Sequence, residues 1–208
     1  MLMFIRAVEE AYKRFNAWAE DPEANPIYAS IRGSVYRSAL EKDPARAVDL
    51  LKKEWFNTKS VDGKLVCLSV LGLCKDADLV KNNLLPFNFN TTPASNSVPS
   101  ADMHALGNSL AVNRVARPIQ WQFIKDNYDS AISKLGNPIV VDRFINLSLS
   151  KFTTLDAVKD IEEFFKDKDT KSFDRTLETA KDKIRGRAAY KERDAAALKE
   201  WLVANGYA

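Results

Sequence analysis

The chain has 208 residues, of which 46% are apolar and 28% are charged; these are the proportions of a globular protein and exclude a disordered or membrane-embedded chain. At this length we expect a core that removes on the order of 70% of the unfolded surface from water. The 31 basic and 28 acidic residues give a net charge of +3 and are interspersed, so the sequence predicts no nucleic-acid-binding stripe.

Apolar residues at helical spacing begin near the start of the chain, where Phe4, Val8, Ala11, Phe15 and Trp18 lie three or four residues apart. This spacing predicts a first helix with one apolar face. Because no earlier helix is available to cover that face, we expect it to stay exposed or shared. The sequence therefore predicts weak self-association through the first helix.

Later helices are marked at their starts by capping residues, in several places followed by proline at the first helical position. The predicted starts are Asn25–Pro26, Asp43–Pro44, Ser60, Asp76, Ser100, Arg117–Pro118, Asn137–Pro138, Thr153, Ser172 and Asp194, and Asn205–Gly206 is predicted to end the last helix. These signals predict about ten or eleven helices of roughly 10 to 18 residues with short connections. We therefore predict an all-α fold, a single domain over residues 1–208 of antiparallel helix pairs stacked as an α-solenoid with a concave face.

The segment from Pro86 to Pro99 departs from this pattern, since it has no charged residue and contains three prolines. It is predicted to be a loop rather than a helix. A loop of this length is often functional. We interpret it as a surface insertion, and a binding loop is the alternative.

Two helices are predicted to be more buried than the rest. Leu65–Cys74 is apolar around most of its circumference, so Cys67 and Cys74 are expected to be buried, reduced thiols. The second, over residues 139–149, is interrupted by a polar stripe of Asp142, Asn146 and Ser150, with Arg143 beside it. An arginine on such a helix needs a partner or a water-filled space.

Catalytic chemistry is missing from the sequence. A zinc peptidase typically uses H-E-x-x-H, and the chain has one histidine, His104, which we interpret as a partly buried helix residue. There is no G-x-S-x-G motif for a serine nucleophile. We therefore predict no catalytic residue, no metal site and no cofactor in this chain.

A basic cluster lies near the C-terminus, interleaved with acidic residues; it comprises Lys181, Lys183, Arg185, Arg187, Lys191 and Arg193. We interpret it as a solvated helix face, and binding to nucleic acid or to an acidic partner is the alternative. No apolar run is long enough for a membrane span, and the first residues lack the pattern of a signal peptide. A cytoplasmic protein without membrane contact is expected.

Several short patterns occur in a distinctive order: Ile31-Arg32-Gly33-Ser34-Val35-Tyr36, Leu71-Gly72-Leu73, the spaced set Asn113, Arg117 and Trp121, then Arg143-Phe144-Ile145 and Phe164-Phe165. In this order they resemble the C-terminal helical domain of the gluzincin zinc aminopeptidases of the puromycin-sensitive and alanyl type. The asparagine-rich composition resembles that of fungal members. The segment over residues 86–99 departs from the family pattern because it is longer than the usual connection.

The resemblance implies a bowl of HEAT-like or armadillo-like helix pairs that closes over a zinc-binding catalytic domain and encloses the peptide substrate. That domain is absent, so zinc is expected outside this chain, and the chain is expected to begin inside the helical domain. The resemblance also implies that Arg143 points to the peptide and orients a carboxylate, with Asp142 and Asn146 as weaker substrate-binding candidates. An internal salt bridge is the alternative role for Arg143.

The leading functional hypothesis is thus the C-terminal domain of a zinc aminopeptidase, inactive alone, with the catalytic domain as its partner. A stand-alone helical-repeat adaptor that binds another protein is the alternative. An independent enzyme is disfavoured by the missing motifs.

Overall fold

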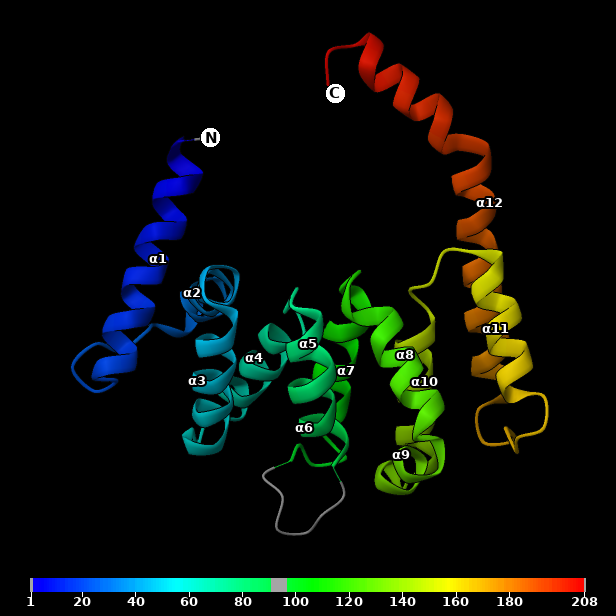
Figure 1. The fold of residues 1–208 in the computed structure, drawn as a ribbon, viewed down its shortest axis with the longest axis horizontal. Helices are drawn as coiled ribbons and strands as arrows, with labels where there is room; N and C mark the ends of the chain where they lie inside the picture. The colour runs from blue at the N-terminus through cyan, green and yellow to red at the C-terminus, as the bar shows by residue number, and fades with distance from the viewer. Residues whose placement is uncertain (1, 91–96, 208) are drawn as a thin grey trace. The chain divides into compact units, whose positions relative to one another are not determined.

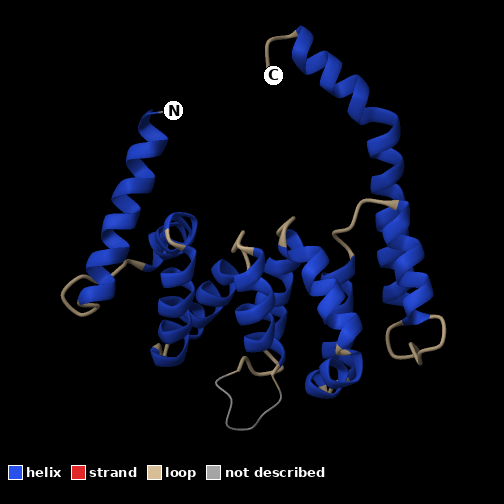
Figure 2. Cartoon of the chain, in the orientation of Figure 1, coloured by secondary structure: helices blue, strands red, loops and turns tan. Residues whose placement is uncertain are grey.

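The computed structural model describes residues 2–90 and 97–207, with side chains from Arg6 onward. Within these ranges it contains twelve α-helices, one π-helical segment and no strand (Figure 2). The prediction of an all-α protein is confirmed. The chain divides into two compact units, Met1–Gly136 and Asn137–Ala208, and the prediction that residues 1–208 form one domain stays a prediction.

The first unit is built of helices that contact the next helix or one a few elements further along the chain (Figure 1). α1 packs on α2, α2 on α3 and α4, α4 on α7, and α7 on α8, an order compatible with stacked helix pairs. The bounds are α1 (Leu2–Glu20), α2 (Ala29–Lys42), α3 (Pro44–Asn57), α4 (Val61–Leu71), α5 (Ala77–Leu79), the π-helical η1 (Val80–Leu84), α6 (Leu85–Phe89), α7 (Met103–Val112), α8 (Ala116–Asp126) and α9 (Tyr128–Leu135).

The second unit contains α10 (Pro138–Leu149), α11 (Leu155–Phe165) and α12 (Asp174–Ala204). α10 and α11 both pack on α12. Buried residues of α12 are confined to its first half and are Leu177, Ala180, Lys181 and Ile184.

Four predicted helix starts are confirmed by side-chain caps. Asp43, Ser60, Asp76 and Asn137 each accept a hydrogen bond from a backbone N–H in the first turn of the helix that follows. Other starts are shifted by one to three residues. At α11, for example, the N-cap is Thr154 rather than the predicted Thr153. The predicted stop is confirmed, since α12 ends at Ala204, with Asn205 at its C-cap.

Two predicted starts are wrong. Asn25–Pro26 lies in the connection, because the Asn25 amide and backbone N–H both donate to Asp21 O and continue the turn after α1, and α2 begins at Ala29. Asp194 starts no helix, since its carboxylate is bound by Arg193 and the alanine-rich sequence around it continues α12. The prediction that the helices have roughly 10 to 18 residues is therefore wrong for this helix, because α12 has 31 residues.

The predicted loop over residues 86–99 begins too early, because Pro86–Phe89 is helical and belongs to α6. Pro86 is the second residue of α6, which continues directly from the π-helical η1, and Phe87 and Phe89 are buried. Residues 91–96 lie outside the described residues. On either side of them, the Lys134 ammonium donates to Asn88 O at 3.0 Å, Asn90 O at 2.6 Å and Ser97 Oγ at 3.1 Å.

α2 covers the C-terminal half of the apolar face of the first helix. Phe15 and Trp18 are 1% and 7% exposed, and their rings lie 6.1 Å and 5.4 Å from the Tyr36 ring. Val8 is half-buried, and the side chain of Phe4 lies outside the described residues. The expectation that Phe15 and Trp18 lack cover is therefore wrong, because α2 supplies it.

The prediction of a buried helix over Leu65–Cys74 is confirmed in its burial but wrong in its end, because α4 stops at Leu71 and Cys74 lies beyond the Gly72 C-cap. Cys67, Leu68, Leu71 and Cys74 are fully buried, and both thiols are free. Burial raises the pKa of the Cys67 thiol to about 12, so this thiol stays protonated and unreactive at neutral pH.

Candidate functional site

The three candidate substrate-binding residues lie on α10. Asn137 caps this helix by accepting from the Ile139 N–H at 2.8 Å, and Pro138 occupies the first turn. The buried face of the helix consists of Val141, Phe144, Ile145, Ser148 and Leu149. This buried face fixes the rotation of α10 and so leaves Arg143 at the surface.

Arg143 is exposed, and it forms no ion pair with any carboxylate in the part of the chain that the structure describes. Asp142 and Asn146 are half-buried. The Asn146 Oδ1 is buried and accepts no hydrogen bond from the described residues. Ser150 leaves the predicted polar stripe, because it is 8% exposed and its carbonyl accepts from Arg187. The roles of the other three residues stay predictions.

A pocket of about 250 Å³ lies in the first unit, where the C-terminal ends of α2, α4 and α7 meet. Its lining includes three cations, Arg37, Lys75 and Arg114. The Glu41 carboxylate lies 3.7 Å from Arg37 and 3.6 Å from Lys75. The remaining lining residues are Leu40, Leu73, Val112, Asn113 and Val115.

Asn113 holds one wall of this pocket together. Its Nδ2 donates to Gly72 O at 3.1 Å and to Cys74 O at 2.6 Å, and its Oδ1 accepts from the Val115 N–H at 3.0 Å. Arg117 donates to Ala111 O at 2.6 Å and to Val112 O at 3.2 Å, so it closes the end of α7. Asn113 and Arg117, two of the three spaced residues that resemble the family pattern, therefore bind backbone carbonyls at helix ends.

Gly72, at the C-cap of α4, lies in close contact with α7. A Cβ at this position would be 2.5 Å from the Ser109 Cβ and 2.7 Å from the Leu110 backbone nitrogen. The Ser109 hydroxyl donates to Ser69 O across the same contact. Sequence reasoning missed the pocket, because its residues come from three separate segments of the sequence. The signal that was available is that Gly72 and Asn113 both belong to the short patterns that resemble the aminopeptidase family.

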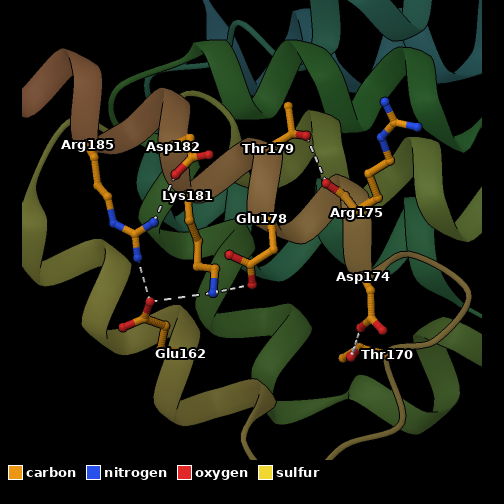
Figure 3. Close-up of polar contacts among 9 residues, drawn as sticks. All are labelled: Glu162, Thr170, Asp174, Arg175, Glu178, Thr179, Lys181, Asp182 and Arg185. Carbon is orange, nitrogen blue, oxygen red and sulfur yellow. Dashed lines mark hydrogen bonds and ion pairs between the residues drawn. The ribbon is translucent and has the colours of Figure 1, made fainter.

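In the second unit an ion-pair network joins α11 to α12 (Figure 3). Glu162 accepts from Arg185 at 2.7 Å and lies 3.5 Å from Lys181 Nζ, which in turn lies 2.6 Å from Glu178. Arg185 also pairs with Asp182 at 3.0 Å. Four of the six residues of the basic cluster, Lys181, Arg185, Arg187 and Arg193, bind groups within the chain, and the interpretation of the cluster as a solvated helix face stays a prediction.

A family model described as the ERAP1-like C-terminal domain matches residues 5–186. The chain belongs to this family. Relatives of this ERAP1-like C-terminal domain include fungal proteins, so the resemblance found from the short sequence patterns is confirmed.

Three relatives illustrate the match. The chain is 24% identical to Aminopeptidase 2 of Candida albicans over 200 residues, which are 96% of this chain and 21% of the relative. It is 26% identical to "Aminopeptidase 2, mitochondrial" of Saccharomyces cerevisiae over 182 residues, 87% of this chain and 18% of the relative. It is 24% identical to Aminopeptidase N of Oryctolagus cuniculus over 195 residues, 92% and 20% respectively. The chain thus spans about a fifth of the length of these relatives.

His104, the one histidine of the chain, is half-buried in α7, and its Nδ1 donates to Ala101 O at 2.8 Å. Over residues 2–90 and 97–207 no three His, Cys, Asp or Glu side chains are grouped to hold a metal ion. Among the described helices, none is long and apolar enough to cross a membrane.

Proposed function

We propose that this chain is the C-terminal domain of a zinc aminopeptidase and closes over the catalytic domain to wall the peptide chamber. The observation that carries the proposal is the family match over residues 5–186, together with relatives named aminopeptidases of which the chain spans only about a fifth. The other four-fifths of such a protein would hold the catalytic zinc. In this arrangement the chain binds and selects peptide by size, and it performs no bond cleavage itself.

Arg143 is the residue we propose to contact the peptide. Its guanidinium is exposed on α10, whose other face is buried, so its position is set by a packed helix. A guanidinium binds a carboxylate through two parallel hydrogen bonds, which fixes the orientation of a peptide chain. Asp142 and Asn146 lie next to it on the helix and are half-buried, so their side chains are partly accessible beside Arg143.

Arg143→Ala in the full-length aminopeptidase tests this role. We expect kcat/KM for peptides to fall by a factor that corresponds to about 1 to 3 kcal/mol, the range for losing a hydrogen bond to a charged group. The free energy of unfolding should change by less than about 0.5 kcal/mol, because the side chain is exposed and unpaired among the described residues. Peptide kinetics and denaturant unfolding are measured on the same variant.

Arg175→Ala is the matched control, since Arg175 is an exposed arginine on α12 without a predicted role. It should leave both quantities unchanged. If Arg143→Ala instead destabilises the protein strongly and the folded fraction keeps normal kinetics, the substrate contact is wrong and Arg143 is a structural residue.

The isolated chain is expected to bind no stoichiometric zinc and to hydrolyse no aminoacyl anilide. One histidine and two buried thiols do not form a zinc ligand set. Metal analysis and an anilide assay on the repurified chain check this expectation. One tightly bound zinc per chain, or turnover that persists through repurification, would contradict it.

The reading frame of the gene separates this proposal from the adaptor alternative, because an H-E-x-x-H motif upstream of residue 1 is expected only for an aminopeptidase. We also propose a cytoplasmic location, supported by the two free, buried cysteines. One relative is named mitochondrial, so cell fractionation decides between the two compartments.

A further inference from the structure

The sequence contains one place where an asparagine directly precedes a glycine, Asn205–Gly206 just past the end of α12. In such a pair the backbone nitrogen of the glycine can reach the side-chain amide carbon of the asparagine, because glycine has no Cβ to crowd the approach. Asparagine is among the heat-labile residues of proteins. In the fold the pair ends the helix, and the proposed function makes no use of its chemistry.

Two hydrogen bonds within the last turn of α12 engage the two groups that would react. The Asn205 Nδ2 donates to Trp201 O at 2.8 Å, and the Gly206 N–H donates to Val203 O at 3.2 Å. Gly206 lies at φ +75, in the left-handed region, and so turns the chain back after the helix. Since the attacking nitrogen must give up its proton and the asparagine amide must turn toward it, the reaction requires this turn to open.

The last turn of α12 contains no buried side chain that would keep it closed. Every residue from 188 to 207 is exposed or half-buried, and the buried residues of α12 lie between positions 177 and 184. Tyr207 stacks on Trp201, with ring centroids 5.9 Å apart and 12° between the ring planes, and its N–H donates to Leu202 O at 2.9 Å. A helix end held by local contacts such as these opens at low free-energy cost.

We propose that Asn205 is a site of spontaneous deamidation, at a rate set by the opening of the last turn of α12. The Gly206 nitrogen attacks Cγ of Asn205 and forms a C–N bond. The bond from Cγ to Nδ2 breaks, and this nitrogen leaves as ammonia with the proton from Gly206. Water then opens the resulting succinimide. Attack at Cγ gives aspartate, and attack at the main-chain carbonyl carbon of residue 205 gives isoaspartate, so water is the co-reactant.

Both products weaken the end of α12. They lack the amide donor to Trp201 O, and they place a negative charge at a helix C-terminus, where the helix dipole disfavours it. Isoaspartate also adds one methylene to the main chain before Gly206, which displaces Tyr207 from Leu202 O and from the Trp201 ring. Deamidation is thus a one-way change that releases the chain end from the helix.

Peptide mapping by mass spectrometry tests the proposal on the 208-residue chain, incubated in mildly alkaline buffer. Asn205 should convert to the acid at least about ten times faster than Asn108, because Asn108 lies within the packed helix α7, whose opening costs more free energy. Asn108 is a suitable reference, since it precedes a small residue, Ser109. Aspartate and isoaspartate forms should both appear. An Asn205 amide that lasts as long as that of Asn108 would overturn the proposal.

Tyr207→Ala tests whether the last turn controls the rate, since it removes the stack on Trp201 and leaves Asn205–Gly206 intact. The conversion should become about two to ten times faster, the factor expected for losing an aromatic pair. Tyr190→Ala is the matched control, because Tyr190 is a tyrosine of α12 that is 52% exposed and lies outside the last turn. It should leave the rate unchanged. No acceleration by Tyr207→Ala, or equal acceleration by both substitutions, would overturn the role of the turn.

The variant Asn205→Asp supplies the aspartate product in pure form. In hydrogen exchange followed by mass spectrometry, the backbone amides of residues 205–207 should exchange faster in this variant than in the unaltered chain, because the turn opens more often. Unchanged exchange would show that the product does not release the chain end, and that part of the proposal would be wrong.

Discussion

Gly72→Ala is expected to lower the free energy of unfolding by about 1 to 3 kcal/mol, the range for inserting a methyl group into a packed contact. The reason is steric, because Gly72 has an ordinary helical backbone with φ −67 and ψ −10. The added Cβ would lie 2.5 Å from the Ser109 Cβ and 2.7 Å from the Leu110 backbone nitrogen. A backbone atom does not move aside as a flexible side chain does, so α4 and α7 must separate.

Gly186→Ala provides the matched control. Gly186 lies inside α12, and a Cβ there meets no atom within 4 Å. The same chemical change should therefore stabilise the protein by about 0.5 to 1 kcal/mol, since alanine favours helix over glycine. Urea unfolding gives both values from the shift in midpoint at constant slope. Equal effects of the two substitutions would show that the α4–α7 contact does not require glycine.

Asn113→Ala is expected to destabilise the protein by about 2 kcal/mol. The Asn113 amide donates to both Gly72 O and Cys74 O, so its removal leaves two carbonyls at the end of α4 without this partner. Asn113→Asp should be at least as damaging, because it keeps the size of the side chain but replaces the donor by an acceptor. Both variants are compared with the wild type by thermal and urea unfolding.

Asn127→Ala controls for the loss of an asparagine that serves only its own helix. Its Nδ2 donates to Phe123 O at 2.9 Å in an exposed position, and we expect a change below about 0.5 kcal/mol. If Asn113→Ala has an effect as small as this, the bonds from Asn113 to the turn after α4 do not hold the pocket wall.

Local signals in the sequence predicted a large part of the secondary structure. A cap followed by proline, as at Asp43–Pro44 and Asn137–Pro138, identifies a helix start, because the donors it satisfies lie within three residues. The same signal failed at Asn25, whose side chain binds backward to Asp21 O. A capping residue can serve the helix on either side, and the local sequence does not decide which.

The candidate sites also differ in whether a local sequence signal could reveal them. Arg143 could be singled out because it interrupts the apolar pattern of its own helix, and the structure places it at the surface of α10. The pocket at the ends of α2, α4 and α7 could not, since Glu41, Lys75 and Arg114 come from distant parts of the sequence. The partner of the Asn113 amide is likewise a turn about 40 residues earlier in the chain, with separations of 41 and 39 residues.

By itself the sequence determined that the chain is helical, where many of its helices begin and end, and which family it resembles, because periodicity, caps and short motifs act over a few residues. Tertiary structure decided which helix covers each apolar face. It placed α2 over Phe15 and Trp18, and it left Tyr190, Leu198 and Trp201 of α12 exposed, although all five residues follow helical spacing in the sequence. An apolar stripe indicates that burial of that helix face is favourable. Only the packing of distant segments determines whether the chain itself provides the opposing surface.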